Sequence, residues 1–118
     1  MFDSEHLEKM REGIQLFNEQ KYWECHESLE DVWMEDRQDP VRNIYWAVIQ
    51  VAAACIHYRD SNEIGAKGMI TKAKEKFRRC REMHVVSPLA IDKLNWEELE
   101  QLTMSEDFEK LYNFRFTI

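Results

Sequence analysis

The segment IYWAVIQVAAACI, residues 44–56, decides the fold, because Gln50 is the one residue that interrupts its two apolar runs. Side chains three or four positions apart share one face of an α-helix. On such a helix the apolar residues of this segment cover two opposite faces. A helix that is apolar around most of its circumference must be covered on both sides. The sequence therefore predicts a central helix that starts at Asp39-Pro40, a cap followed by proline, and ends near Arg59.

Three more helices are predicted around this one, at residues 4–19, 22–35 and 63–83. In each of them apolar residues recur at helical spacing. The chain has only 3 glycines and 2 prolines, and a β-sandwich of many short strands needs more turn residues than that. We predict an all-α fold, a compact bundle of four main helices in a single domain over residues 1–118.

The C-terminal third predicts shorter elements. Ser87-Pro88 is a second cap-plus-proline signal and predicts a short helix. Asn95 is predicted to cap another helix over residues 96–102. Residues 112–118 alternate between apolar and polar side chains, as a strand does, but no other segment offers a strand to pair with. We therefore expect an extended tail that packs on the bundle, while the pattern leaves the conformation of residues 103–118 otherwise open.

The charge pattern bears on partners and location. The net charge of −7 disfavours nucleic acid as a partner. Residues 65–84 are nevertheless basic, with 7 bases and 2 acids, and are either a solvated helix face or an anion-binding surface. The apolar runs are too short to cross a bilayer even when joined, and residues 1–20 do not resemble a secretory signal. A cytoplasmic location is expected, and a small-molecule ligand and a homo-oligomer both remain open.

The three cysteines, Cys25, Cys55 and Cys80, are far apart and form no CxxC motif. Each lies beside apolar residues in a different predicted helix. We expect buried, reduced and unpaired thiols.

Two pairs of polar residues could form a functional site. His26 and Glu30 are four residues apart and therefore neighbours on one helix, with Glu27 about one turn before Glu30. Gln50 and His57 share a face of the central helix, and the small Ala53 lies between them. If the two helices pack together, we expect His26 and Glu30 to face Gln50 and His57.

This cluster is compatible with three kinds of chemistry. Imidazoles and a carboxylate are ordinary ligands for zinc, iron or manganese. A histidine oriented by a glutamate is also a general acid–base pair. A buried histidine can equally belong to a purely structural polar network. The run His26–Glu30 lacks the second histidine of the zinc-peptidase motif, so no metal or cofactor is assigned.

The other aromatic and histidine residues are assigned more simply. Trp23, Trp33 and Trp46 are interpreted as core, with a role as pocket walls as the alternative. His6 and His84 are expected to be ordinary surface or edge residues.

The chain also resembles a family of small microbial proteins known only as a domain of unknown function, family 309. Residues 17–18, 22–27, 29–30 and 33 carry the resemblance in a first block, and residues 49–50, 52–53, 57, 62 and 65–66 in a second. Gln20 and Ser61 depart from the glycines that the family often has in its turns. The resemblance implies an all-helical fold and no established activity. The positions that it marks complete the candidate site: catalytic residues His26, Glu27, Glu30 and His57, and ligand-binding residues Trp33, Gln50 and Asn62.

Overall fold

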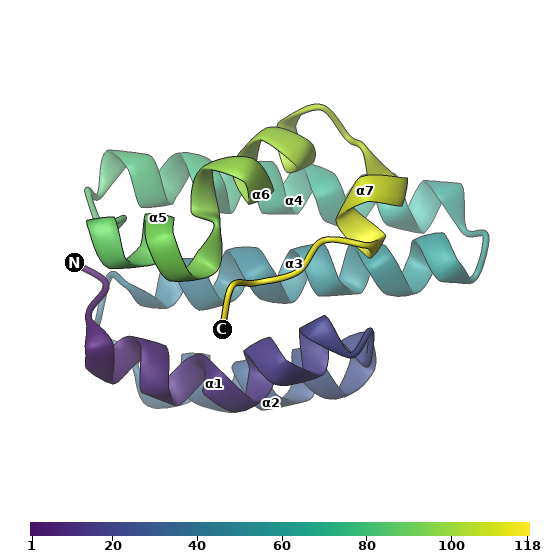
Figure 1. Cartoon of the computed structure of the whole chain (residues 1–118). Helices are drawn as coiled ribbons and strands as arrows, with labels where there is room; N and C mark the ends of the chain where they lie inside the picture. The colour runs from purple at the N-terminus through teal and green to yellow at the C-terminus, as the bar shows by residue number, and fades with distance from the viewer.

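The computed structural model describes residues 1–118 and contains seven helices and no strand. The helices, drawn in Figure 1, are α1 (Ser4–Asn18), α2 (Tyr22–Glu35), α3 (Arg42–Arg59), α4 (Glu63–Glu82), α5 (Pro88–Leu94), α6 (Trp96–Met104) and α7 (Phe108–Tyr112). The all-α prediction is confirmed, and the four main helices lie within about two residues of their predicted bounds.

Helix α3 is the centre of the molecule. It lies between the α1–α2 pair on one side and α4 on the other (Figure 1). Val48 and Ala52 on one face are buried, and so is Gln50 on the opposite face. The two-sided apolar pattern of residues 44–56 therefore reports two real packing interfaces, and the predicted central helix is confirmed.

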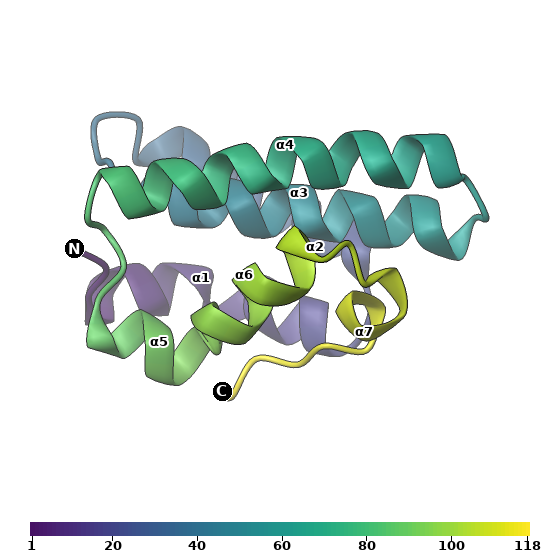
Figure 2. The ribbon, with the colours of Figure 1, turned by 90° about the horizontal axis from the view of Figure 1, so that it is seen from above.

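Helix α4 runs back along α3, and the three short helices cover the remaining side of this pair (Figure 2). The apolar residues that recur at helical spacing in α4 are buried from Ala66 to Cys80, as the pattern predicts. Phe77 of α4 packs against Trp96 of α6, with ring centroids 4.6 Å apart. Since aromatic rings bury large apolar areas, this contact fixes α6 on α4.

Two predicted helix caps act differently in the structure. Asp39 does not start α3. Its side chain accepts a hydrogen bond from the Val41 N–H in a turn that precedes the helix, so α3 begins at Arg42. Asn95 makes no side-chain cap on α6; it adopts a left-handed conformation with φ 47° between α5 and α6. Its amide instead holds the tail, donating to the Arg115 carbonyl and accepting from the Thr117 hydroxyl.

The tail is extended and packed on the bundle from residue 114, as predicted, but Tyr112 belongs to α7, which the sequence did not predict, and Asn113 caps that helix. Phe114 and Phe116 are buried, and each packs its ring edge-on against Phe17. The Asn18 amide donates to the Phe116 carbonyl and accepts from the Phe116 N–H. The tail thus completes the core over the end of α1.

All three cysteines are buried and unpaired, as expected. Burial raises the pKa of each of these thiols to about 12, so they are inert at neutral pH. None of the seven helices combines the length and the apolar character that a bilayer span requires.

Candidate functional site

A small cavity lies where α2, α3 and α4 meet. Its volume is about 180 Å³, and it opens to solvent at one side. The residues that line it are His26, Glu30 and Trp33 of α2, Trp46, Ile49, Gln50 and Ala53 of α3, and Met69 and Lys72 of α4. The structure therefore brings together His26, Glu30, Gln50 and Trp33, four of the seven predicted site residues.

His26 lies at the α2 side of this cavity with a quarter of its side chain exposed. Its Nδ1 atom is 3.7 Å from a Glu30 carboxylate oxygen and 3.9 Å from a Glu27 carboxylate oxygen. Both distances exceed a hydrogen bond. The ring stacks parallel to Trp23, with centroids 5.8 Å apart. The imidazole is thus held in place by stacking and by two nearby negative charges, while Nδ1 has no hydrogen-bond partner.

Two further polar atoms of the cavity lack partners. The Gln50 side chain is only 9% exposed, yet its Oε1 accepts no hydrogen bond. The Trp33 indole Nε1–H donates none. Together with His26 Nδ1, these are the three buried side-chain polar atoms of the molecule without a partner. All three belong to residues that line this one cavity.

Two tryptophans form the aromatic wall. The Trp33 and Trp46 rings are 5.0 Å apart and tilted by 58°. Cations cover them: the Arg42 guanidinium lies 3.9 Å from the Trp33 ring centre, and the Lys76 ammonium 4.1 Å from that of Trp46. Such contacts stabilise the ring positions. Trp33 and Trp46 therefore act as pocket walls, whereas Trp23 is 58% exposed, so its assignment to the core is wrong.

Lys72 and Glu30 place opposite charges on the cavity lining. Most other bases of the basic stretch already pair with carboxylates: Lys74 with Glu106, Arg79 with Glu75, and Arg81 with Glu100. The buried Lys76 stacks on Trp46, and burial, followed by the charge of Arg79, lowers its pKa. Lys72 forms no such pair, so its charge remains available to a bound molecule.

His57 and Asn62 do not line this cavity, so the expected arrangement with His26 and Glu30 facing His57 is wrong. His57 lies two turns beyond Gln50, and its Nδ1 is 3.2 Å from the Asn62 amide nitrogen. Asn62 also caps α4 by accepting from the Gly65 N–H. These two residues therefore brace the α3–α4 turn. Glu27 contributes only its carboxylate near His26, from the exposed side of α2.

Known proteins match this chain over the region that contains most of the cavity lining. The model of a family described as a domain of unknown function (DUF309) matches residues 10–69. The chain belongs to this family. It is also 38% identical over 52 residues to the uncharacterized protein YpuF of Bacillus subtilis (strain 168). That match covers 44% of this chain and 30% of YpuF, so the chain spans about a third of the length of this relative. No solved structure matches significantly.

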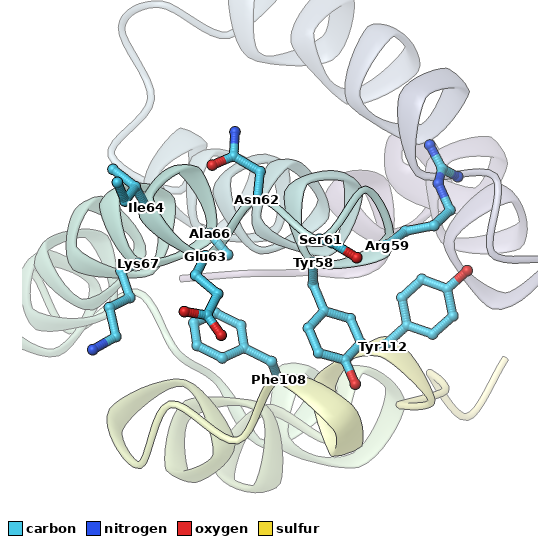
Figure 3. A pocket seen from close by; sticks show the side chains of 10 residues that line it. All are labelled: Tyr58, Arg59, Ser61, Asn62, Glu63, Ile64, Ala66, Lys67, Phe108 and Tyr112. Carbon is cyan, nitrogen blue, oxygen red and sulfur yellow. The ribbon is translucent and has the colours of Figure 1, made fainter.

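The matched range includes every cavity-lining residue of this DUF309 protein except Lys72. It also includes most of a larger cavity, about 1000 Å³, which lies beside the α3–α4 turn and α7. The rings of Tyr58, Phe108 and Tyr112 line that cavity (Figure 3). Its lining holds no buried polar atom without a partner, so it lacks the feature that marks the smaller one.

A third candidate cluster lies where His6, which precedes the matched range, meets the loop between α2 and α3. His6 is 9% exposed, so its assignment as a surface or edge residue is wrong. Its Nδ1 accepts from the Asp3 N–H and its Nε2 lies 2.7 Å from Asp39. Such a bond back to the cap residue is a capping box, and the Asp3–His6 spacing could have revealed it.

His6, Asp36 and Asp39 also bring three potential metal-ligating atoms within 4.8 Å of one another. Each is already engaged. Asp36 accepts from the Tyr45 hydroxyl and pairs with the Lys9 ammonium, each at 2.8 Å. Because a cation already neutralises Asp36, the cluster is best explained as a tether that joins α1 to the α2–α3 loop.

Proposed function

We propose that this DUF309 protein binds a small polar molecule in the cavity between α2, α3 and α4. The observation that carries the proposal is that His26, Trp33 and Gln50, the three residues with an unpartnered buried polar atom, all line this one cavity. Ligand sites are mostly apolar concave surfaces with a few polar groups that fix orientation. This cavity has that composition.

Unpartnered buried polar atoms are unfavourable for a purely structural network. Buried polar groups are nearly always hydrogen-bonded, and each one left without a partner costs about 1–3 kcal/mol. A network that served stability alone would pair Gln50 with His26 or Glu30. Instead the Gln50 acceptor and the Trp33 donor have no partner within the protein, and a bound ligand would supply one.

A catalytic role for the same site is a second candidate. His26 Nδ1 lies within 4 Å of two carboxylates, Glu27 and Glu30. Carboxylates beside an imidazole can orient it, which suits general acid–base chemistry. In this version His26 transfers the proton while Glu30 positions it, and Gln50 and Trp33 hold the substrate. Removal of His26 would then abolish turnover while binding persists.

The indole N–H signals of the four tryptophans offer a direct test. The protein, labelled with nitrogen-15, is titrated with acetate, acetamide and methylammonium as probes. We expect at least one probe to shift the Trp33 signal, identified by its loss in Trp33→Phe. The signal of Trp96, which is buried at the contact between α6 and α4, should stay in place. The Gln50→Leu variant should abolish the shift, and the exposed control Gln101→Leu should preserve it. If no probe moves the Trp33 signal, the proposed site is wrong.

A further inference from the structure

We infer that the ligand of this cavity is a small α-amino acid in its zwitterionic form, with a short apolar side chain. The inference rests on the proposed function, because it names the ligand class for the same site. Three independent features of the lining carry it: the charges, the inner hydrogen-bonding groups and the size.

The charges on the lining have opposite signs and come from different helices. Glu30 of α2 is half exposed, and its nearest basic group is the His26 ring at 3.7 Å. Lys72 of α4 forms no ion pair, unlike its neighbours Lys74 and Arg79. A ligand with a single charge would leave one of these two groups unmatched. A zwitterion satisfies both, with its ammonium toward Glu30 and its carboxylate toward Lys72.

Besides His26 Nδ1, the unpartnered polar atoms of the lining residues are one acceptor, on Gln50, and one donor, on Trp33. Gln50 Oε1 can only accept a hydrogen bond and Trp33 Nε1–H can only donate one. An ammonium group supplies the donor that Gln50 lacks, and a carboxylate supplies the acceptor that Trp33 lacks. In an α-amino acid these two groups are attached to the same carbon. Such a ligand can therefore reach both atoms within one small cavity.

The size of the cavity limits the side chain. Its 180 Å³ equals the liquid volume of about six water molecules at roughly 30 Å³ each. The six non-hydrogen atoms of alanine fit within that volume. The remaining lining is apolar, with Ile49, Ala53 and Met69, and suits a methyl group. Large side chains such as that of tryptophan exceed the space.

The test compares alanine with two analogues that each carry only one of its charges. The wild-type protein is titrated with L-alanine, propionate and ethylammonium, and the Trp33 indole signal is followed. We expect alanine to bind at least about tenfold more tightly than either analogue, because it matches both charges. If propionate or ethylammonium binds as tightly as alanine, the inference of a zwitterionic ligand is wrong, while the proposed function of binding a small polar molecule still holds. If none of these probes moves the signal, and acetamide does not either, the proposed function fails as well.

Charge variants make the assignment specific. Glu30→Gln should weaken the binding of alanine and of ethylammonium and leave the binding of propionate unchanged. Lys72→Met should weaken the binding of alanine and of propionate and leave the binding of ethylammonium unchanged. Glu24→Gln and Lys67→Met, exposed positions on the same two helices, are the matched controls and should change nothing. Equal effects on all three probes, or none, would overturn the proposed orientation.

Discussion

The Leu29 side chain of α2 packs directly onto the backbone of Gly13 in α1. A Cβ atom at position 13 would lie 2.4 Å from Leu29 Cδ2 and 2.5 Å from Leu29 Cγ. Both residues are buried, and Leu29 is fully covered, so it has little room to move. The close approach of α1 and α2 therefore depends on the absence of a side chain at Gly13.

Replacement of Gly13 by alanine should destabilise the protein by about 1–3 kcal/mol, the usual cost of forcing an extra group into a packed core. Gly68→Ala is the matched control, because nothing lies within 4 Å of the added Cβ on the exposed side of α4. That change should stabilise by about 0.5–1 kcal/mol, since alanine favours helix over glycine. Urea unfolding of the two variants measures both effects. Equal responses would contradict the packing described for α1 and α2.

The His6–Asp39 contact predicts how stability changes in acid. Burial acts to raise the pKa of Asp39, but hydrogen bonds from His6 and the Val41 N–H outweigh it and lower that pKa below its usual value. A carboxyl group whose pKa is lowered by folding stabilises the protein above its unfolded pKa, about 3.9. This contribution is lost as the pH falls through the lower, folded pKa.

The melting temperature should therefore drop as the pH is taken from about 4 to 2, and Asp39→Asn should make that drop shallower. Its contribution is modest because the side chain is 36% exposed and solvent screens it. Asp31→Asn, at an exposed position of α2, is the control and should follow the wild-type curve. If the melting temperature of Asp39→Asn instead falls in parallel with that of the wild type over this pH range, the His6–Asp39 contact is not an acid-sensitive tether.

Much of the fold could be predicted because helical periodicity directly records which side chains are buried. The apolar stripes of residues 44–56 and 66–80 identified the central helix and its partner. The tail was harder, because its main contact joins Asn18 to Phe116 across 98 positions of sequence. The role of Asn95 was missed for the same reason: its partners lie in the tail, and nothing local signals them.

The site was predictable only in part, since a shared helix face does not fix position along the helix. Gln50 and His57 do share a face, but seven residues separate them by about 10 Å at 1.5 Å per residue. His26 and Glu30 line the same cavity as Gln50. His57 instead contacts Asn62 in the turn between α3 and α4. Lys72 was not identified, because the pattern could not show which face of α4 packs beside α2.

Changes at His26 and Glu30 separate a functional site from a structural network. The Glu30 carboxylate is half exposed and 3.7 Å from His26, and such pairs contribute about 0–1 kcal/mol. Glu30→Ala should therefore alter stability by less than about 0.5 kcal/mol, as surface changes usually do. His26→Ala should cost about 1 kcal/mol or less, because no hydrogen bond of Nδ1 is lost and alanine favours the helix. Losses of about 2–3 kcal/mol at both positions in urea unfolding would indicate a structural network.

Gln50→Leu should stabilise the protein. Gln50 is only 9% exposed. The change to leucine keeps the size of the side chain and removes an acceptor that has no partner. The gain should be about 1 kcal/mol, which raises the melting temperature by a few degrees, roughly 4 °C for a chain of this size. Gln101→Leu, at an exposed position of α6, should give no such gain. Because functional sites often trade stability for activity, a more stable Gln50→Leu variant that no longer binds the probes would identify Gln50 as a residue retained for its ligand. A variant that is less stable by about 1 kcal/mol or more would instead show that the Gln50 amide supports the fold.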